Sequence, residues 1–247
     1  MNPFSLKGKT ILVTGASSGI GRAIAIECSK MKANVVITAR NEDRLNGTLS
    51  QMEGSGHSVI IADLNNADDR IRLAEQLPKL DGLVNCAGIV KTLLFQFIDT
   101  NSLTEIMNVN FISPTLLSAL LVENKKLVKK SSIVFISSVS GIQCAWKGNS
   151  MYSASKGAIN GMMKNMALDL ATKEIRVNSI NPGMIETSIL EDGIIDLEQL
   201  EEDKKLYPLK RYGKPEEVAY AVIYLLSDAS CWVTGSNIVI DGGYTLN

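Results

Sequence analysis

Short runs of β-branched and aliphatic residues alternate along the chain with longer segments of helical periodicity, and this alternation restricts the fold more than any other feature. The runs are residues 10–14, 34–39, 58–62, 82–86, 132–137, 175–180 and 237–240. Their apolar residues are continuous, which is typical of strands in a sheet that is covered on both faces. Strands that alternate with helices are joined in parallel by right-handed crossovers. The sequence therefore predicts an α/β fold, with about seven parallel strands in a doubly wound sheet and helices on both faces.

The length of the chain allows one large domain or two small ones. The chain has 247 residues, whereas an average domain has roughly 150. No linker, repeat or low-complexity segment divides it, so we expect a single domain over residues 1–247. Lys and Arg number 25 and Asp and Glu 26, a formal net charge of −1, which excludes a generally basic nucleic-acid-binding protein. No apolar run reaches the roughly 18 residues that span a bilayer, so we expect no membrane association.

The cysteines and the histidine exclude several kinds of site. The four cysteines, Cys28, Cys86, Cys144 and Cys231, are widely separated, and His57 is the only histidine. This pattern has neither the paired spacing of a zinc site nor the density of a disulfide framework, so we expect no metal. Reduced thiols are typical of a cytoplasmic protein. A mechanism with histidine as the base is disfavoured, because His57 lies in a loop-like Gly-Ser-Gly-His stretch.

A glycine-rich segment, residues 14–21 (Thr-Gly-Ala-Ser-Ser-Gly-Ile-Gly), lies between the first predicted strand and the first predicted helix. Its glycines allow a sharp turn and let the backbone approach a pyrophosphate, while the helix N-terminus offers free N–H groups. The spacing is G-x3-G-x-G rather than G-x-G-x-x-G, but its place after a buried strand favours dinucleotide binding in a Rossmann-type fold. The predicted cofactor contacts here are Gly15, Ser17, Ser18, Gly19, Ile20 and Gly21.

The end of the second predicted strand is the position that reads the ribose of a dinucleotide. An acidic residue there accepts a hydrogen bond from a 2′-hydroxyl and repels a 2′-phosphate, but this chain has Ala39 followed by Arg40. A guanidinium pairs with a phosphate through two parallel hydrogen bonds, so Arg40 favours NADP(H) over NAD(H). The alternative is that Arg40 is only a solvated residue at a strand end. Asp63, after the third strand, is either an acceptor for the adenine amino group or an ordinary turn aspartate.

Tyr152 and Lys156 lie four residues apart at the start of a predicted helix over residues 151–172, so both lie on one helical face. A free tyrosine has a pKa of about 10, and a nearby ammonium stabilises the phenolate and lowers this pKa. The pair is therefore a candidate general acid/base that needs no histidine. Ser138 follows the fifth predicted strand, where parallel sheets place ligand-contacting groups. Its hydroxyl is either a group that polarises a carbonyl or an ordinary turn serine.

Taken together, these motifs resemble the short-chain dehydrogenase/reductase family. The matching elements are residues 14–21, 85–88 (Asn-Cys-Ala-Gly), Asn110, Ser138, the Tyr152–Lys156 pair and residues 181–183 (Asn-Pro-Gly), in the family's order over essentially the whole chain. The resemblance implies that Tyr152 donates a proton to a carbonyl oxygen and that Ser138 stabilises this oxygen. It also implies that Lys156 binds the nicotinamide ribose and lowers the pKa of Tyr152, and that Asn110 holds a water molecule in a proton relay.

The resemblance also implies the remaining cofactor contacts. Besides Tyr152 and Lys156, these are Leu64, Asn85, Cys86, Ala87, Gly88, Pro182, Gly183, Ile185 and Thr187, with the last three at the nicotinamide end. The chain departs from the family pattern at Cys86, where the family usually has a second Asn. It departs again at Ser18, where many NADP-preferring members carry a basic residue, so the NADP(H) preference rests on Arg40.

The C-terminal third is similar to the bacterial 3-oxoacyl-acyl-carrier-protein reductases in residues 212–218, 233–236 and 241–243. We therefore expect an NADPH-dependent reductase of a ketone, in particular of a 3-oxoacyl thioester on an acyl carrier protein. Reductases of sugars, steroids and other secondary alcohols share these residues, so an NAD(P)-linked dehydrogenase of such an alcohol is an alternative. A dinucleotide-sensing or scaffold protein is a third, because fold does not determine function.

Three further segments carry expectations. Residues 187–212 are charged and helix-prone, with seven acids from Glu191 to Asp203, which is typical of a solvated excursion or of a substrate lid. Lys129 and Lys173 lie where the carrier-protein reductases have basic residues near the pocket mouth, suited to an acidic carrier protein. The predicted helix over residues 151–172 has more apolar residues than one sheet face needs, and the resemblance implies a homotetramer or homodimer.

Overall fold

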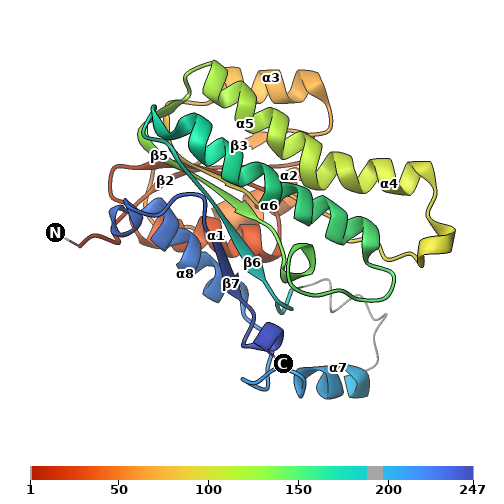
Figure 1. Ribbon diagram of the computed structural model, residues 1–247. Coiled ribbons are helices and arrows are strands. Elements are labelled where there is room, and N and C mark those ends of the chain that lie inside the picture. Colours follow the sequence, from red (N-terminus) through yellow and green to blue (C-terminus); the bar gives the residue numbers. More distant parts are fainter. Residues whose placement is uncertain (1, 188–196, 247) are drawn as a thin grey trace.

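The computed structural model describes residues 2–187 and 197–246 (Figure 1). Its strands are β1 (Thr10–Thr14), β2 (Asn34–Ala39), β3 (Ser58–Ile61), β4 (Leu80–Asn85), β5 (Leu127–Ile136), β6 (Arg176–Pro182) and β7 (Asn237–Ile240). They form one seven-stranded sheet in the order β3-β2-β1-β4-β5-β6-β7, and every neighbouring pair is parallel. The predicted α/β class with a parallel Rossmann-type sheet is confirmed.

The helices cover both faces of this sheet. They are α1 (Gly19–Lys30), α2 (Glu42–Leu49), α3 (Ala67–Gln76), α4 (Thr100–Met107), α5 (Ser113–Glu123), α6 (Ser150–Ala171), α7 (Leu197–Lys204) and α8 (Pro215–Leu226). One apolar core joins α1, α2 and α8 to the sheet, and a second joins α3, α5 and α6 to the opposite face. Figure 1 shows these two layers, with α3, α5 and α6 above the sheet and α1 and α8 below it.

The order of the strands reverses at β1. The chain proceeds outward from β1 through β2 to β3, and then β4 returns to the other side of β1. At such a switch point, the loops after the two central strands diverge and leave a crevice outside their carboxyl ends, where ligands bind in this class of fold. The segments after β1 and β4 are therefore the structural basis of a binding site.

The starts of the helices differ in how their backbone N–H groups are satisfied. The Asn41 side chain accepts a hydrogen bond from the N–H of Arg44 before α2, and the Asn66 side chain caps α3. Ser18 occupies the same position before α1, but its side chain makes no capping hydrogen bond. Because the first turn of a helix carries unpaired N–H groups, α1 presents donors to the crevice at the end of β1.

The predicted lid is described only in part. Residues 188–196 of it lie outside the described residues, while α7 forms within residues 197–204.

The helical stretch Thr100–Glu123 is long and apolar enough, by length and composition, to cross a membrane, a property that the run-length criterion did not reveal. This is weak evidence of a span, because core helices have the same composition, and Leu117 and Leu121 of this stretch are fully buried against the sheet.

Candidate active site and cofactor site

The turn between β1 and α1 has room for glycine alone at two of its positions. A Cβ atom on Gly15 would lie 2.7 Å from the Cα atom of Ala87, and one on Gly21 would lie 2.3 Å from the carbonyl oxygen of Gly15. Gly15 also has a φ of +67°, which glycine adopts without steric cost. The close packing brings the backbone of the turn directly against the segment after β4.

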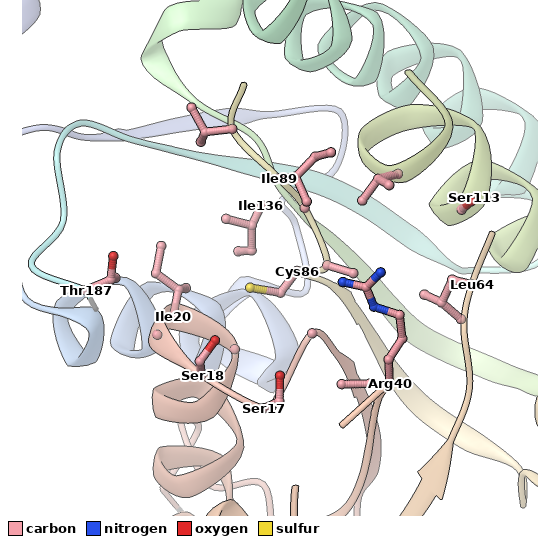
Figure 2. Close-up of a pocket in the computed structure, with 18 of the residues that line it drawn as sticks. Ser17, Ser18, Ile20, Arg40, Leu64, Cys86, Ile89, Ser113, Ile136 and Thr187 are labelled. Carbon is pink, nitrogen blue, oxygen red and sulfur yellow. The ribbon is translucent and has the colours of Figure 1, made fainter. Parts of the chain in front are cut away.

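A cavity of about 800 Å³ opens where these segments meet, and Figure 2 shows part of its lining. The predicted cofactor contacts that line it are Gly15, Ser17, Ser18, Gly19, Ile20, Gly21, Arg40, Asp63, Leu64, Cys86, Ala87, Gly88, Pro182, Gly183, Ile185 and Thr187, and they are joined by Ser138, Tyr152 and Lys156. Residues that are far apart in the sequence thus surround one space. Its volume lies within the roughly 300–1,000 Å³ of typical ligand sites.

Two predicted residues do not line this cavity. The side chain of Asn85 turns toward α5, where its Nδ2 donates to Ser118 Oγ at 3.1 Å. Asn110 lies in a π-helical turn, Asn108–Ile112, and its amide exchanges two hydrogen bonds with the backbone of Ile89, at 2.8 and 2.9 Å. Both side chains therefore hold the segment after β4 in place from behind the cavity wall.

The sequence reasoning missed several lining residues. They are Thr38, Ala39, Asn41, Arg44, Ala62, Asn65, Ile89, Val90, Val109, Ser113, Ile136, Ser137 and Met184. Ile136 and Ser137 precede Ser138 at the end of β5, so the rule that placed Ser138 there could have found them. Arg44 lies four residues after Arg40, and this spacing could have indicated that both arginines face the cavity. Val109 is next to the motif residue Asn110 in the π-helical turn, and Ser113 begins α5, where no motif indicates a contact with the cavity.

One end of the cavity is exposed and carries two arginines. Arg40, Asn41 and Arg44 are all exposed, and the guanidinium of Arg40 points into the cavity (Figure 2). Asp63 lies at the same end, where its Oδ1 accepts a hydrogen bond from the N–H of Asn65 at 3.0 Å, as in an ordinary turn. The second carboxylate oxygen has no such turn contact, so both interpretations of Asp63 remain compatible with the structure.

The other end of the cavity is buried and contains the predicted catalytic residues. Ser138 follows β5, and its Oγ accepts a hydrogen bond from the N–H of Ser140 at 3.1 Å. Tyr152 and Lys156 come from the first two turns of α6. The Lys156 Nζ donates to the carbonyl oxygen of Ile136 at 2.8 Å and lies 5.8 Å from the centre of the Tyr152 ring. A phenol, a hydroxyl and an ammonium thus meet at one place.

Burial controls the protonation of this end. Desolvation lowers the pKa of Lys156 to about 8 and raises the pKa of Tyr152, while a hydrogen bond to the Ser138 hydroxyl opposes the shift of Tyr152. Desolvation is the largest cause of the raised Tyr152 pKa, and the predicted role of Lys156 in lowering this pKa stays a prediction. The Tyr152 phenol is protonated at neutral pH. Burial also raises the pKa of the Cys86 thiol to about 12, so this thiol is neutral.

The cavity fits a dinucleotide on several independent grounds. The turn at Gly15 and Gly21 has no space for side chains, which lets a pyrophosphate approach the backbone. The N-terminus of α1 has unpaired N–H donors because Ser18 does not cap it. The Oγ1 atom of Thr38, at the cavity wall, is buried and has no hydrogen-bond partner. Among residues 2–187 and 197–246, no group of His, Cys, Asp or Glu is arranged to hold a metal ion.

The two lysines expected near the pocket mouth lie far from it on this chain. Lys129 is near the amino end of β5 and pairs with Glu174 at 2.7 Å, whereas Ser138 lies beyond the carboxyl end of the same strand, roughly 30 Å away at the rise of a strand. Lys173 follows the C-terminus of α6, and Tyr152 is in the first turn of that helix, again roughly 30 Å away. Within one chain, both lysines thus lie toward the edge of the sheet opposite to the cavity, which sequence order does not show.

Comparison with known proteins decides the family. A family profile described as "Enoyl-(Acyl carrier protein) reductase" matches residues 15–245. A tropinone reductase homolog from Arabidopsis thaliana is 36% identical over 252 residues, which cover 99% of this chain and 95% of that protein. The chain belongs to the short-chain dehydrogenase/reductase family.

Other members of the short-chain dehydrogenase/reductase family differ in their named substrates. The 3-oxoacyl-[acyl-carrier-protein] reductase of Thermotoga maritima is 35% identical over 247 residues, covering 98% of this chain and 99% of that protein. The structure of a putative 2-deoxy-d-gluconate 3-dehydrogenase from Agrobacterium tumefaciens with bound NADP is 30% identical, has a TM-score of 0.89 and covers 100% of both chains. The chain is a short-chain NAD(P)-dependent oxidoreductase, so the sensor or scaffold alternative is not retained.

Proposed function

We propose that this protein is an NADPH-dependent reductase that converts a ketone to a secondary alcohol. The observation that carries the proposal is the meeting of the Tyr152 phenol, the Ser138 hydroxyl and the Lys156 ammonium at one end of a cavity whose other end carries Arg40 and Arg44. Reduction of a carbonyl needs a proton donor at the oxygen, and a tyrosine with a raised pKa keeps its proton at neutral pH.

Each predicted catalytic residue has a separate role in the reduction of the carbonyl group. When bound, reduced nicotinamide supplies a hydride to the carbonyl carbon. Tyr152 donates its proton to the oxygen, so that hydride and proton together complete the alcohol. The Ser138 hydroxyl donates a hydrogen bond to the same oxygen and stabilises the negative charge that develops on it. Lys156 stabilises the phenolate that forms after proton transfer, and Asn110 supports the segment after β4 on which the cofactor rests and belongs to the proton relay.

The selectivity for NADP(H) rests on the two arginines at the exposed end. Arg40 is the first residue after β2, and Arg44 lies one turn into α2 on the same side of the cavity. Each guanidinium can pair with a 2′-phosphate, and no carboxylate occupies the strand end to repel it. The NADP bound to the Agrobacterium structural relative supports the same preference.

We propose a 3-oxoacyl thioester as the substrate, because 3-oxoacyl-[acyl-carrier-protein] reductases of 32–35% identity match nearly all of the chain. Docking of a carrier protein through Lys129 and Lys173 is not part of the proposal. The second candidate is a dehydrogenase of a sugar or another secondary alcohol. It is favoured by the similarity to the gluconate dehydrogenase structure and to the tropinone reductase homologs.

A substrate panel with both cofactors tests these candidates. Purified protein is mixed with NADPH or NADH and either acetoacetyl thioester, cyclic ketones or keto-sugars, and cofactor oxidation is followed at 340 nm. We expect NADPH oxidation with the thioester that is lost in Tyr152→Phe. A higher kcat/KM for a sugar or cyclic alcohol with NAD would favour the second candidate. Equal rates for wild type and Tyr152→Phe would refute the mechanism.

The proposal includes a cytoplasmic homotetramer or homodimer made of one domain per chain. Leu103, Ile112 and Leu116 expose apolar surface around α4 and α5, and Leu168 on α6 is 76% exposed. Exposed apolar surface of this kind marks protein interfaces. All four cysteines are free thiols, which suits a reducing compartment. Light scattering after size-exclusion chromatography tests the assembly, and a monomer at micromolar concentration would contradict it.

A further inference from the structure

Four aromatic side chains from three separate segments form a continuous cluster beside the nicotinamide end of the cavity. Trp146 stacks on Tyr244 with ring centres 5.6 Å apart, and its Nε1 donates to the Tyr244 hydroxyl at 3.1 Å. Tyr244 packs against Tyr207 at 4.8 Å, and Tyr207 meets Tyr212 edge-on at 5.5 Å. The cluster thereby joins the loop after Ser138, the segment after α7 and the C-terminal segment.

Tyr207 is the member of this cluster that touches the wall of the cavity. Its hydroxyl accepts a hydrogen bond from the N–H of Met184 at 3.3 Å. Its ring lies against Gly183, where a Cβ atom would come within 3.5 Å of Tyr207 Cε1. Gly183 and Met184 both line the cavity, while Tyr207 itself is only 2% exposed. A fully buried side chain therefore holds two consecutive cavity residues by their backbone.

The same wall segment, residues 183–187, has a second support at Gly213, directly after Tyr212 in the sequence. The N–H of Gly213 donates to the carbonyl oxygen of Met184 at 3.0 Å, and the N–H of Glu186 donates to Gly213 at 2.8 Å. These backbone bonds would persist if the Tyr207 hydroxyl were removed. The hydroxyl is thus an additional contact, which sets the position of the Gly183–Met184 peptide without being needed for the path of the chain.

We propose that Tyr207 is a positioning residue for cofactor binding, which fixes the Gly183–Met184 peptide at the nicotinamide end of the cavity. The Tyr207 ring packs in turn against Tyr244, on which Trp146 stacks. This inference rests on the proposed function, because it assumes that NADPH occupies the cavity. Tyr207 donates nothing to the reacting atoms, so its effect falls on the affinity for cofactor, and the chemical step is left to Ser138, Tyr152 and Lys156.

Two tyrosines of the cluster provide a matched test. Tyr207→Phe removes the hydroxyl that holds Met184, whereas Tyr212→Phe removes a hydroxyl that donates to Asp203 Oδ2 at 2.8 Å and contacts no residue of the 183–187 segment. Both variants keep their rings in the cluster. The affinity for NADPH is measured by isothermal titration calorimetry, kcat and KM by steady-state kinetics, and stability by thermal unfolding.

We expect Tyr207→Phe to raise the Kd for NADPH by about 3- to 10-fold, the value of one modest hydrogen bond, with kcat within about twofold of wild type. Tyr212→Phe should leave the Kd for NADPH within about twofold of wild type, even if it lowers the unfolding temperature as much as Tyr207→Phe does. Equal Kd values for both variants and wild type, or an equal rise in both variants, would overturn the assignment of Tyr207. A wild-type protein that binds neither NADPH nor NADH would instead overturn the proposed function, and this inference with it.

Discussion

The two ends of the cavity differ in how far their charged side chains are exposed to solvent. At the exposed end, Arg40 and Arg44 remain in contact with solvent. At the other end, Lys156 is buried and Tyr152 is partly buried, and desolvation lowers the pKa of Lys156 and raises that of Tyr152. The charged side chains are thus solvated at the end where the cofactor would be selected, and Lys156 is desolvated at the end where the chemistry would take place.

This difference separates the consequences of substitution at the two ends. A change at the buried end alters the free energy of protonation of a group that touches the reacting atoms, so we expect it to act on kcat and on stability. A change at the exposed end alters a solvent-screened attraction, so we expect it to act on cofactor affinity and to weaken with salt. Four variants test this separation.

The largest effect is expected for Tyr152→Phe. The substitution keeps the ring at the buried end and removes the proton donor, and general acid catalysis contributes about 10²- to 10⁴-fold. We expect kcat to fall by this factor while the Kd for NADPH, measured by calorimetry, changes by less than about threefold. A comparable loss of cofactor affinity would mean that the two ends are not separate.

Lys156→Met is expected to lower kcat by about 100-fold or more and yet to stabilise the fold. The fall in pKa from 10.5 to about 8 corresponds to roughly 3 kcal/mol of desolvation cost at neutral pH. Loss of the hydrogen bond to the Ile136 carbonyl destabilises the fold by about 1 kcal/mol and so offsets part of the relieved desolvation cost. The free energy of unfolding, measured in urea at pH 7, should therefore rise by about 2 kcal/mol.

The pH dependence of stability should also differ between the wild type and Lys156→Met. Because the pKa of Lys156 is lower in the folded state, the unfolded chain binds more protons between pH 8 and 10.5. The contribution of Lys156 to the stability of the wild type is thus lowest below pH 8 and increases as the pH rises through that window. In Lys156→Met this increase should be absent. Identical slopes for the two proteins would contradict the buried charge.

The double variant Arg40→Ala/Arg44→Ala should show the opposite behaviour. We expect the Kd for NADPH to rise by about 10- to 30-fold, as for loss of charge-assisted hydrogen bonds. The Kd for NADH and kcat at saturating cofactor should change by less than about twofold. Single variants measured at low and high salt apportion the effect, because a screened attraction weakens as salt is added. No change in the Kd for NADPH would remove the basis of the NADP(H) preference.

The smallest effect is expected for Cys86→Asn. The thiol lies at the buried end but is neutral, since burial raises its pKa to about 12. The segment after β4 is held by its backbone, whose N–H groups donate to Thr14 Oγ1 at 3.1 and 3.2 Å. We therefore expect kcat and the Kd for NADPH to stay within about twofold of wild type. A larger loss would show that the side chain at this position contributes directly.

What the sequence could predict depended on whether a feature is local. The strand runs, the glycine turn and the Tyr152–Lys156 spacing are local patterns with a direct structural meaning, and the fold, the glycine turn of the cavity and the catalytic pair followed from them. The remaining predicted lining came from the resemblance to the family. The position of Lys129 and the role of Tyr207 depend on which edge of the sheet and which neighbours a residue meets. The desolvation that raises the Tyr152 pKa was not predictable for a related reason, because burial is a property of the assembled fold.

The uncapped start of α1 links occupancy of the site to the stability of the whole fold. Ser18 leaves the first N–H groups of this helix to be satisfied by another molecule, and α1 packs along the same apolar core as α8. A bound anion that caps α1 would therefore raise the unfolding temperature in proportion to the logarithm of its concentration. Heating the protein with different nucleotides would then rank them as ligands before any substrate is known.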